Sequence, residues 1–393
     1  MKILFIHNRY QLQGGEDAVV EQEIKLLSQY HEVEVLYFQN QSGYKGFIQF
    51  LISIWNTNAS KKVSKKIIEF KPDVVHIHNW HFACGPLVIR SIYILKIPIV
   101  HTIHNYRLLC PSGTLLNNGK LFTHSLKQFF PLTSVINKVY RSSYTLTFWL
   151  AFVVWFHKRI NTWQKIDSYV CLTPLAVTLF QESHFGISER RFTVKPNFTS
   201  IPIRKEPLER GMHFLFIGRL SEEKGITLLL EAFQDLPYCL SIAGDGPLKE
   251  HVVNTVKKSQ NVAYLGNLSK EEIESELQKT QALIFPSVWY EPFGLVNIEA
   301  FANSTPVLAS NIGAPQSLII EGYNGFLFEA GNKTALKDAI IKFYELSKID
   351  KEEMGNHALE EYKSKYSPDL QLGYLNSIYN SVIKNNKQSS VNL

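Results

Sequence analysis

The sequence has few cysteines, and none of them forms a recognisable pair. Its four cysteines, Cys84, Cys110, Cys171 and Cys239, are scattered over 393 residues without a C-x-x-C spacing. This pattern argues against a zinc site and against a disulfide framework, and it is typical of a reducing compartment. The chain begins with a short strand-like run rather than the long apolar stretch of a signal peptide. We therefore expect a cytoplasmic protein.

Acidic residues are missing from a long internal segment. Between Asp73 and Asp167 there is no Asp or Glu, although Lys and Arg are frequent there. Charge of one sign over such a length indicates an anionic partner. We see no nucleic-acid-binding motif and no helix with regularly spaced cations, so nucleic acid is not the expected partner.

Within this acid-free segment, residues 144–159 are rich in Phe and Trp and end in cations. The apolar part, Leu146 to Phe156, is too short to span a bilayer, which takes about 20 residues. We expect residues 120–165 to contact an anionic membrane surface, with an interfacial helix at 144–159. A buried core helix is the alternative.

Strand-like runs alternate with segments long enough for helices, and the pattern occurs twice. Such alternation predicts doubly wound parallel sheets in an α/β protein. The first set of strands is 3–7, 32–38, 74–78, 99–102, 168–172 and 193–195. The second set is 214–217, 239–243, 262–265, 283–285, 306–309 and 325–328. No G-x-G-x-x-G follows the first strand, which disfavours a dehydrogenase.

A polar stretch with two prolines, residues 201–207, separates the two sets. We therefore predict two Rossmann-like domains, residues 1–203 and 204–368. A chain of 393 residues with 45% hydrophobic content is long enough for two cores. Residues 369–393 are expected to form a helix to about residue 384 that packs on the N-terminal domain. A disordered polar tail is expected after it.

Two acids eight positions apart, Glu291 and Glu299, form the most informative pattern. A short buried strand precedes Glu291 and a helix can open at Asn297, so Glu291 lies in a loop and Glu299 in the first helical turns. Ligands of open α/β sheets bind in such crevices. The carboxylates can accept sugar and ribose hydroxyls but would repel a second phosphate.

The turn between these acids can bind a phosphate. The N–H groups of Gly294, Leu295 and Val296 would point out of the helix N-terminus, and the glycine allows an anion to approach the backbone. Together with the two carboxylates, this arrangement predicts a nucleotide-sugar ligand.

The segment from Ser287 to Glu299 resembles the Glu-x7-Glu motif of retaining glycosyltransferases of the family 4, or group 1, type. That family has the GT-B fold, two Rossmann-like domains facing a central cleft. The resemblance implies that Glu291 meets the transferred sugar and Glu299 the nucleotide ribose. It also places Phe293 in the donor site.

Three further segments of the second domain resemble the family. The Gly218-Arg219-Leu220 and Glu223-Lys224-Gly225 elements imply that Arg219 and Lys224 stabilise the diphosphate as the sugar leaves. Gly244 and Gly246 belong to a segment that resembles the family's Gly-x-Gly-Pro loop near the nucleotide base, and the backbone at Leu265 could hold that base. The resemblance therefore adds Gly218, Gly244, Gly246 and Leu265 to the donor site.

The first domain offers a glycine pair and several histidines. Gly14-Gly15 precedes a helix and could present N–H groups to phosphate, or it is only a flexible turn. His76 and His78 share one strand face. No acidic ligand accompanies the histidines in sequence, so we expect no metal and no cofactor. The resemblance places His104 beside the transferred sugar.

The resemblance implies a retaining, metal-independent glycosyltransferase with a UDP- or GDP-sugar as co-substrate. In this chemistry the departing phosphate oxygen accepts the proton of the acceptor hydroxyl. The acid-free segment suggests a saccharide or lipid-linked saccharide acceptor in bacterial surface polysaccharide or lipopolysaccharide biosynthesis, with the enzyme peripheral on the inner face of the cell membrane. The alternatives are a nucleotide-sugar 2-epimerase of the same fold and a non-catalytic membrane-surface binding protein.

Overall fold

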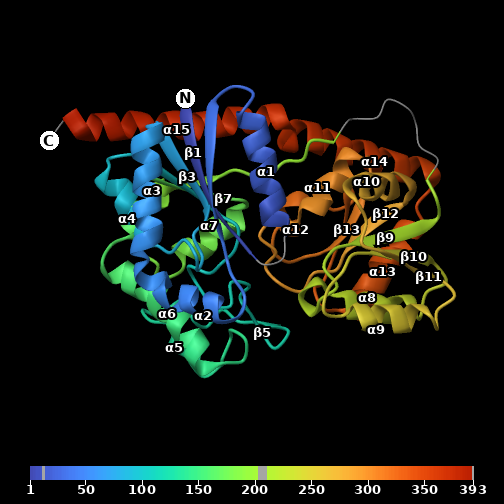
Figure 1. Ribbon diagram of the computed structural model, residues 1–393. Coiled ribbons are helices and arrows are strands. Elements are labelled where there is room, and N and C mark those ends of the chain that lie inside the picture. Colours follow the sequence, from blue (N-terminus) through green and yellow to red (C-terminus); the bar gives the residue numbers. More distant parts are fainter. Residues whose placement is uncertain (11–13, 202–209, 392–393) are drawn as a thin grey trace. The chain divides into compact units, whose positions relative to one another are not determined.

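The computed structural model describes residues 1–10, 14–201 and 210–391 (Figure 1). The chain forms two compact units. Unit 1 comprises Met1–Asn117, Phe122–Asn197 and Pro368–Leu393, and unit 2 comprises Asn118–Leu121 and Phe198–Ser367.

The chain passes from unit 1 to unit 2 between Asn197 and Phe198, before the boundary expected at residue 203. Phe198 is already buried, and the carbonyl of Thr199 accepts a hydrogen bond of 2.8 Å from the hydroxyl of Tyr362 in unit 2. These contacts hold the chain to unit 2 ahead of the polar stretch. Most of that stretch, and the expected boundary itself, lie outside the described residues.

Unit 1 contains a six-stranded parallel sheet in the order β2-β1-β3-β4-β7-β8. The strands are β1 (Lys2–Arg9), β2 (Glu32–Gln39), β3 (Val74–Asn79), β4 (Ile99–Ile103), β7 (Ser168–Cys171) and β8 (Phe192–Val194). The helices are α1 (Gly15–Leu27), α2 (Gly43–Ile52), α3 (Thr57–Phe70), α4 (Leu87–Ile94), α5 (Leu132–Ile136), α6 (Tyr144–Arg159) and α7 (Pro174–Gln181), with 3-10 turns η1 (Ser53–Trp55), η2 (Trp163–Lys165) and η3 (Glu189–Arg191).

Unit 2 contains a second six-stranded parallel sheet in the order β11-β10-β9-β12-β13-β14. Its strands are β9 (His213–Ile217), β10 (Cys239–Ala243), β11 (Val262–Gly266), β12 (Ala282–Phe285), β13 (Val307–Ser310) and β14 (Gly325–Phe328). Its helices are α8 (Ile226–Phe233), α9 (Lys249–Val256), α10 (Lys270–Lys279), α11 (Leu295–Ala302), α12 (Pro315–Leu318), α13 (Lys333–Tyr344) and α14 (Lys348–Glu361), with a 3-10 turn η4 (Glu222–Lys224) and a π turn η5 (Tyr362–Tyr366).

The predicted fold class, two doubly wound parallel-sheet units, is confirmed. Every expected strand is present, with its ends shifted by no more than two residues. The short strands β5 (Leu116–Asn117) and β6 (Lys120–Leu121) were not anticipated, because two-residue strands leave no periodic signal.

The last helix, α15 (Pro368–Val391), belongs to unit 1. Leu375 and Tyr379 of α15 pack with Ile3, Phe5 and Val100 of the sheet in one buried cluster. The expectation of a disordered tail after residue 384 was wrong, because the helix continues to Val391. Residues 384–390 contain no Gly or Pro, and extending an existing helix costs far less than starting one.

Helix α6, which covers the aromatic segment, is partly buried. Its N-terminus is capped by Ser143, whose side chain accepts from Leu146 N, and its last turn carries two cations, Lys158 and Arg159, that suit the helix dipole. Leu150, Ala151 and Val153 face the interior, whereas Phe148 is exposed. Among the described residues, no helix has both the length and the hydrophobicity needed to span a bilayer.

Candidate functional site

The strand order of unit 2 reverses at its centre. From β9 the chain proceeds through β10 and β11 on one side, whereas β12 pairs with β9 on the other side. The loops that leave the carboxyl ends of β9 and β12 therefore lie next to each other. Open α/β sheets bind ligands at such a switch point, and both predicted catalytic loops, residues 218–225 and 286–294, are located here.

Glu291 is the centre of this loop pair. Its side chain is buried, and three donors meet at the same carboxylate oxygen, Oε2. The indole Nε1 of Trp289 donates at 2.9 Å, Ser287 Oγ lies at 3.5 Å, and Lys224 Nζ forms an ion pair with this oxygen. The carboxylate is thereby held in one orientation, and its contact with sugar hydroxyls stays a prediction.

Lys224 reaches Glu291 because Gly225 lets two backbone segments approach closely. Gly225 has φ +70°, and a Cβ on it would lie 2.0 Å from the carbonyl oxygen of Pro286. The same segments are joined by a hydrogen bond of 3.0 Å from Val288 N to Glu223 O. The Lys-Gly pair in the sequence thus has a steric reason, since any larger residue at 225 would push Lys224 away from Glu291.

The other predicted donor positions lie on neighbouring loops of the same sheet edge. Gly218 N donates to Ala243 O at 3.1 Å, so the loops after β9 and β10 are joined. Gly244 N in turn donates to Gly266 O at 2.7 Å, next to Leu265 and one loop further on. Gly246 packs against the backbone of Leu220. Arg219 is exposed in the first of these loops.

Helix α11 begins at Leu295, two residues before the expected start, and Gly294 is its N-cap. Gly294, Leu295 and Val296 therefore lie at the helix N-terminus, as predicted. Phe293 is 2% exposed, and its ring packs on that of Tyr366 with centroids 6.1 Å apart. Its place in the donor site stays a prediction.

Glu299 lies within α11 and is half-buried. Burial raises the pKa of its carboxyl above the ordinary value, an effect that Lys270 partly opposes. A carboxyl in this state suits hydrogen bonding to a neutral hydroxyl better than binding to a cation.

The strand order of unit 1 reverses between β1 and β3, and the Gly14-Gly15 turn follows β1. Gly14 N donates to Asp17 Oδ2 at 2.9 Å, and Asp17 Oδ1 lies 2.8 Å from His7 Nε2. The N–H of Gly14 therefore already donates a hydrogen bond to a carboxylate of the same chain. Glu16 and Asp17 also place acid in the first turn of α1, which is unfavourable for a phosphate.

Glu16 is a candidate functional residue that the sequence analysis missed. Burial, with Asp17 as the next contribution, raises the pKa of its carboxyl to about 8. Asn79 at the end of β3 and Arg107 both lower this pKa and so partly oppose the effect of burial. Such a carboxyl at a switch point can donate a hydrogen bond at neutral pH. The only sequence signal was the acid pair directly after Gly15.

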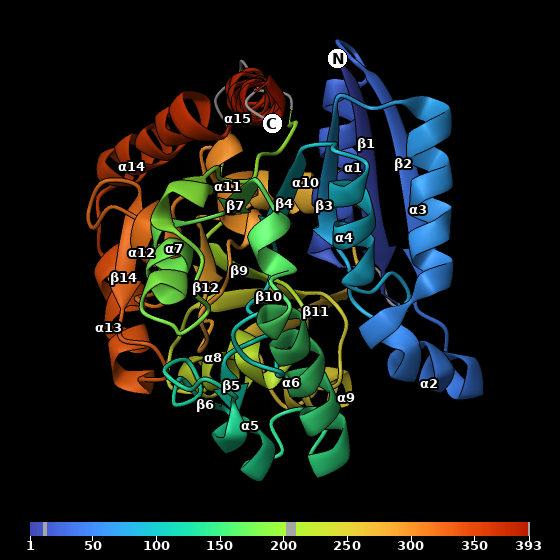
Figure 2. The same ribbon diagram turned by 90° about the vertical axis from the view of Figure 1, so that its left-hand side faces the viewer.

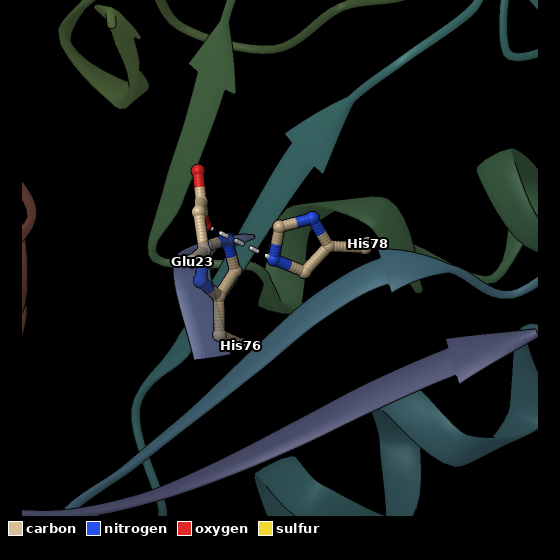
Figure 3. Close-up of side chains that lie close together, drawn as sticks. All are labelled: Glu23, His76 and His78. Carbon is tan, nitrogen blue, oxygen red and sulfur yellow. Dashed lines mark ion pairs between the residues drawn. The ribbon is translucent and has the colours of Figure 1, made fainter. Parts of the chain in front are cut away.

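A buried polar network extends from α1 to the loop after β4. Figure 3 shows two of its members, Glu23 and His78, together with His76. Lys195 Nζ lies 2.5 Å from Glu23 Oε1, and Glu23 Oε2 lies 3.4 Å from His78 Nε2. His78 Nδ1 then lies 2.9 Å from His104 Nε2. His104, the predicted sugar-contacting residue, is thus the outer end of a chain that starts at a buried ion pair.

Burial lowers the pKa of His78 and of His104 well below the ordinary value, so both rings are neutral. In the contact between His78 Nδ1 and His104 Nε2 one ring donates and the other accepts, and the tautomers set which ring does so. His78 and His104 line a cavity of about 20 Å³ together with Asn79 and Arg107. This volume holds one water molecule.

Glu23, His76 and His78 lie close enough together to suggest a metal site. An acid thus accompanies these histidines in space, although none neighbours them in the sequence. The contacts nevertheless favour a hydrogen-bond network. Lys195 already neutralises Glu23, and the two ring nitrogens of His76 lie 2.8 Å from Tyr379 OH and from Thr102 Oγ1.

Two Rossmann-like units, each with candidate groups at its switch point, define the architecture of GT-B glycosyltransferases. The crystal structure of Anabaena HepE in complex with UDP has this fold. It aligns with 97% of this chain and 100% of its own, with a TM-score of 0.70 and 17% sequence identity.

Family models identify the chain itself. Residues 14–201 match Glycosyltransferase Family 4, and residues 201–361 match Glycosyl transferases group 1. The chain belongs to this glycosyltransferase family.

Curated relatives match over part of their length. An uncharacterised glycosyltransferase of Methanocaldococcus jannaschii is 33% identical over 155 residues, which is 39% of this chain and 43% of that protein. The D-rhamnosyltransferase WbpZ of Pseudomonas aeruginosa is 31% identical over 158 residues, 39% of this chain and 41% of that protein. The chain thus matches less than half the length of each.

Proposed function

We propose that the protein is a retaining, metal-independent glycosyltransferase. Its donor is a UDP- or GDP-sugar, and its acceptor is a saccharide or lipid-linked saccharide of bacterial surface polysaccharide assembly, met at the inner face of the cell membrane. The observation that carries the proposal is the arrangement at Glu291, where Lys224, Trp289 and Ser287 converge on one carboxylate oxygen. Family membership and the UDP bound by HepE support the choice of donor.

The proposed reaction breaks the bond from the anomeric carbon to the diphosphate oxygen and forms a bond to the acceptor oxygen on the same face. The proton of the acceptor hydroxyl passes to the departing phosphate oxygen. Glu291 and His104 accept hydrogen bonds from the sugar hydroxyls, and Glu299 accepts from the ribose. Lys224, Arg219 and the N–H groups at the start of α11 stabilise the charge that develops on the diphosphate.

The first test is nucleotide release from UDP-, GDP- and ADP-sugars, with and without a membrane-lipid extract. We expect release from one donor that increases with the extract and is lost in Glu291→Gln. NMR of the product's anomeric proton would then show retention. If no donor releases its nucleotide, the result would favour the non-catalytic binding protein. If the nucleotide sugar is instead epimerised, the result would favour the epimerase.

Substitution of Lys224 tests whether this residue contributes to donor binding or to catalysis. Because its charge is most needed when the diphosphate leaves, Lys224→Ala should lower kcat by about 100-fold or more, a typical loss for one charge-stabilising group. Donor Kd, measured by calorimetry, should change much less. An unchanged kcat would remove Lys224 from the mechanism.

A further inference from the structure

Nearly half of the exposed large hydrophobic side chains of the described chain gather at one end of unit 1. They lie on α2, η1, α6 and the segment 129–136 that includes α5. These side chains are Tyr44, Phe47, Ile48, Leu51, Ile52, Trp55, Phe129, Leu132, Ile136, Tyr144 and Phe148. We call this set the apolar face. A monomeric soluble protein rarely exposes so much apolar surface without a partner.

The elements of the apolar face are packed against one another. α2, α5 and α6 lie at the same end of unit 1 (Figures 1 and 2), and α6 contacts both of the other helices. Trp149 Nε1 of α6 donates to Phe50 O of α2 at 2.8 Å, and the rings of Phe130 and Phe148 have centroids 5.9 Å apart. The face is thus a continuous surface on a fixed scaffold, formed by segments that lie far apart in the sequence.

A groove of about 440 Å³ runs into the apolar face between α2 and α6. Almost all the surface that lines it is apolar. The lining residues are Phe47, Phe50, Leu51, Val135, Tyr144, Thr145, Leu146, Phe148 and Trp149. Hydrocarbon groups of a partner can therefore bind in this groove, beneath the exposed side chains.

The charge around the apolar face has one sign. The segments that carry it lie within residues 35–68 and 74–166, neither of which contains an Asp or Glu. Lys138 lies over the ring of Tyr144 at 4.3 Å, and Lys158 and Arg159 lie over the ring of Phe129 at 5.4 and 5.6 Å. Within the described part of the chain, none of these three cations has an ion-pair partner.

We propose that the apolar face is the docking surface for an anionic lipid bilayer. Tyr, Trp and Phe side chains would enter the headgroup region and the hydrocarbon boundary, and the surrounding Lys and Arg would contact lipid phosphates. The structure adds α2 and η1, residues 43–55, to the segment 120–165 expected from the sequence. The proposal is independent of the proposed catalysis, because its test requires no turnover.

Two other occupants fit the observations less well. A second copy of the chain on the same face would bring cations against cations, since the face has no acids to pair with them. A nucleic acid would match the charge but would leave the exposed Leu, Ile and Phe side chains without an apolar environment. A bilayer surface offers both phosphates and hydrocarbon.

The test is flotation of the full chain with vesicles in a density gradient. Binding is expected to vesicles that contain phosphatidylglycerol, to be weaker to pure phosphatidylcholine, and to decrease with added salt. Phe47→Ser/Phe148→Ser should weaken binding about tenfold or more. The control is Tyr374→Ser on α15, because Tyr374 is 47% exposed, as is Phe148, but lies outside the face.

The cations are tested in the same assay. Lys138→Gln/Arg159→Gln should weaken binding to anionic vesicles by several-fold to about tenfold. The exposed pair Lys257→Gln/Lys258→Gln in unit 2 serves as the matched control and should bind as the unmodified protein does. Melting followed by circular dichroism confirms that each variant is folded.

Three outcomes would overturn the proposal. The first is no flotation with either vesicle type. The second is an equal loss in the Tyr374 or Lys257/Lys258 controls, which would show that no particular face is used. The third is light scattering that finds a dimer, dispersed by Phe47→Ser/Phe148→Ser, without vesicle binding. That result would assign the face to a second copy.

Discussion

At the scale of single residues, three glutamates are removed from water and each is stabilised in a different way. Glu291 is held by an indole N–H and a lysine, and Glu23 is paired with Lys195. At Glu16 burial outweighs the opposing charge of Arg107, and the pKa of the carboxyl rises to about 8. Residue type alone therefore does not determine which carboxylate is charged at neutral pH.

Glu16 should make the stability of the protein depend on pH. Its carboxyl has a pKa of about 8 in the folded chain and an ordinary value in the unfolded chain. As pH rises between these values the unfolded chain loses its proton first, so stability decreases up to about pH 8 and then levels off. The expected loss is on the order of 3 kcal/mol. In Glu16→Gln, urea unfolding midpoints measured from about pH 5 to pH 9 should decrease less.

The control for this measurement is Glu231→Gln, which changes an exposed carboxylate on α8. Its midpoints should follow those of the unmodified protein at every pH. A Glu16→Gln variant with an unchanged slope would show that Glu16 does not retain its proton.

At the scale of elements, the strands and the start of α11 follow from local chemistry. Most strands of the two sheets are apolar or alternating runs. Such a run can be located in the sequence without knowing which distant segments cover it. The start of α11 depends on Gly294, which has φ +80°. The loop from β12 to α11 could therefore be located from the sequence, and so could Glu291 and Glu299.

Gly294→Ala should destabilise the start of α11 for two reasons. The backbone lies in the left-handed region, and the new Cβ would lie 2.8 Å from Asn297 Nδ2 and 2.9 Å from the ring of Phe285. We expect a loss of about 2–3 kcal/mol in urea unfolding followed by circular dichroism. Gly322→Ala is the matched control, because it has φ +74° but no atom within 4 Å. It should cost only about 1 kcal/mol. Equal losses would contradict the steric account.

At the scale of the whole molecule, α15 returns the end of the chain to the first sheet. Tyr379 is fully buried, and its hydroxyl lies 2.8 Å from His76 Nδ1 on β3. The residues that hold His104 in place therefore come from α1, β3, the end of β8 and indirectly from α15. Disturbing α15 should affect unit 1 as a whole.

Tyr379→Phe removes this hydroxyl and leaves a buried ring nitrogen of His76 without its partner. The expected loss is about 1–3 kcal/mol. Tryptophan fluorescence during urea unfolding reports on it, since Trp55, Trp80, Trp149, Trp155 and Trp163 all lie in unit 1. Tyr374→Phe, the same change at an exposed position of the same helix, should have little effect. A loss of the same size in both variants would refute a specific role for the Tyr379 hydroxyl.

Much of the candidate site in unit 2 could be located from the sequence, whereas much of the candidate site in unit 1 could not. Lys224 and Glu291 each stand in a loop directly after a strand, and neighbouring strands bring those loops together. Glu23 and Lys195 are separated by most of unit 1 and carry no motif. The apolar residues of α2 are typical of any amphipathic helix. Their part in a larger surface becomes visible only because α6 lies beside them in the structure.

The strands, the two-sheet architecture and the loops that carry Glu291, Lys224 and Gly294 could all be located from the sequence. Hydrophobic periodicity and turn chemistry act over a few residues, so they can be read along the chain. Three features are visible only in the tertiary structure. Glu16 is shielded from water, and Glu23 and Lys195 form a buried pair beside His78. In addition, α2 and α6 share one apolar face. Burial and charge pairing depend on which distant segments the sheet order brings into contact.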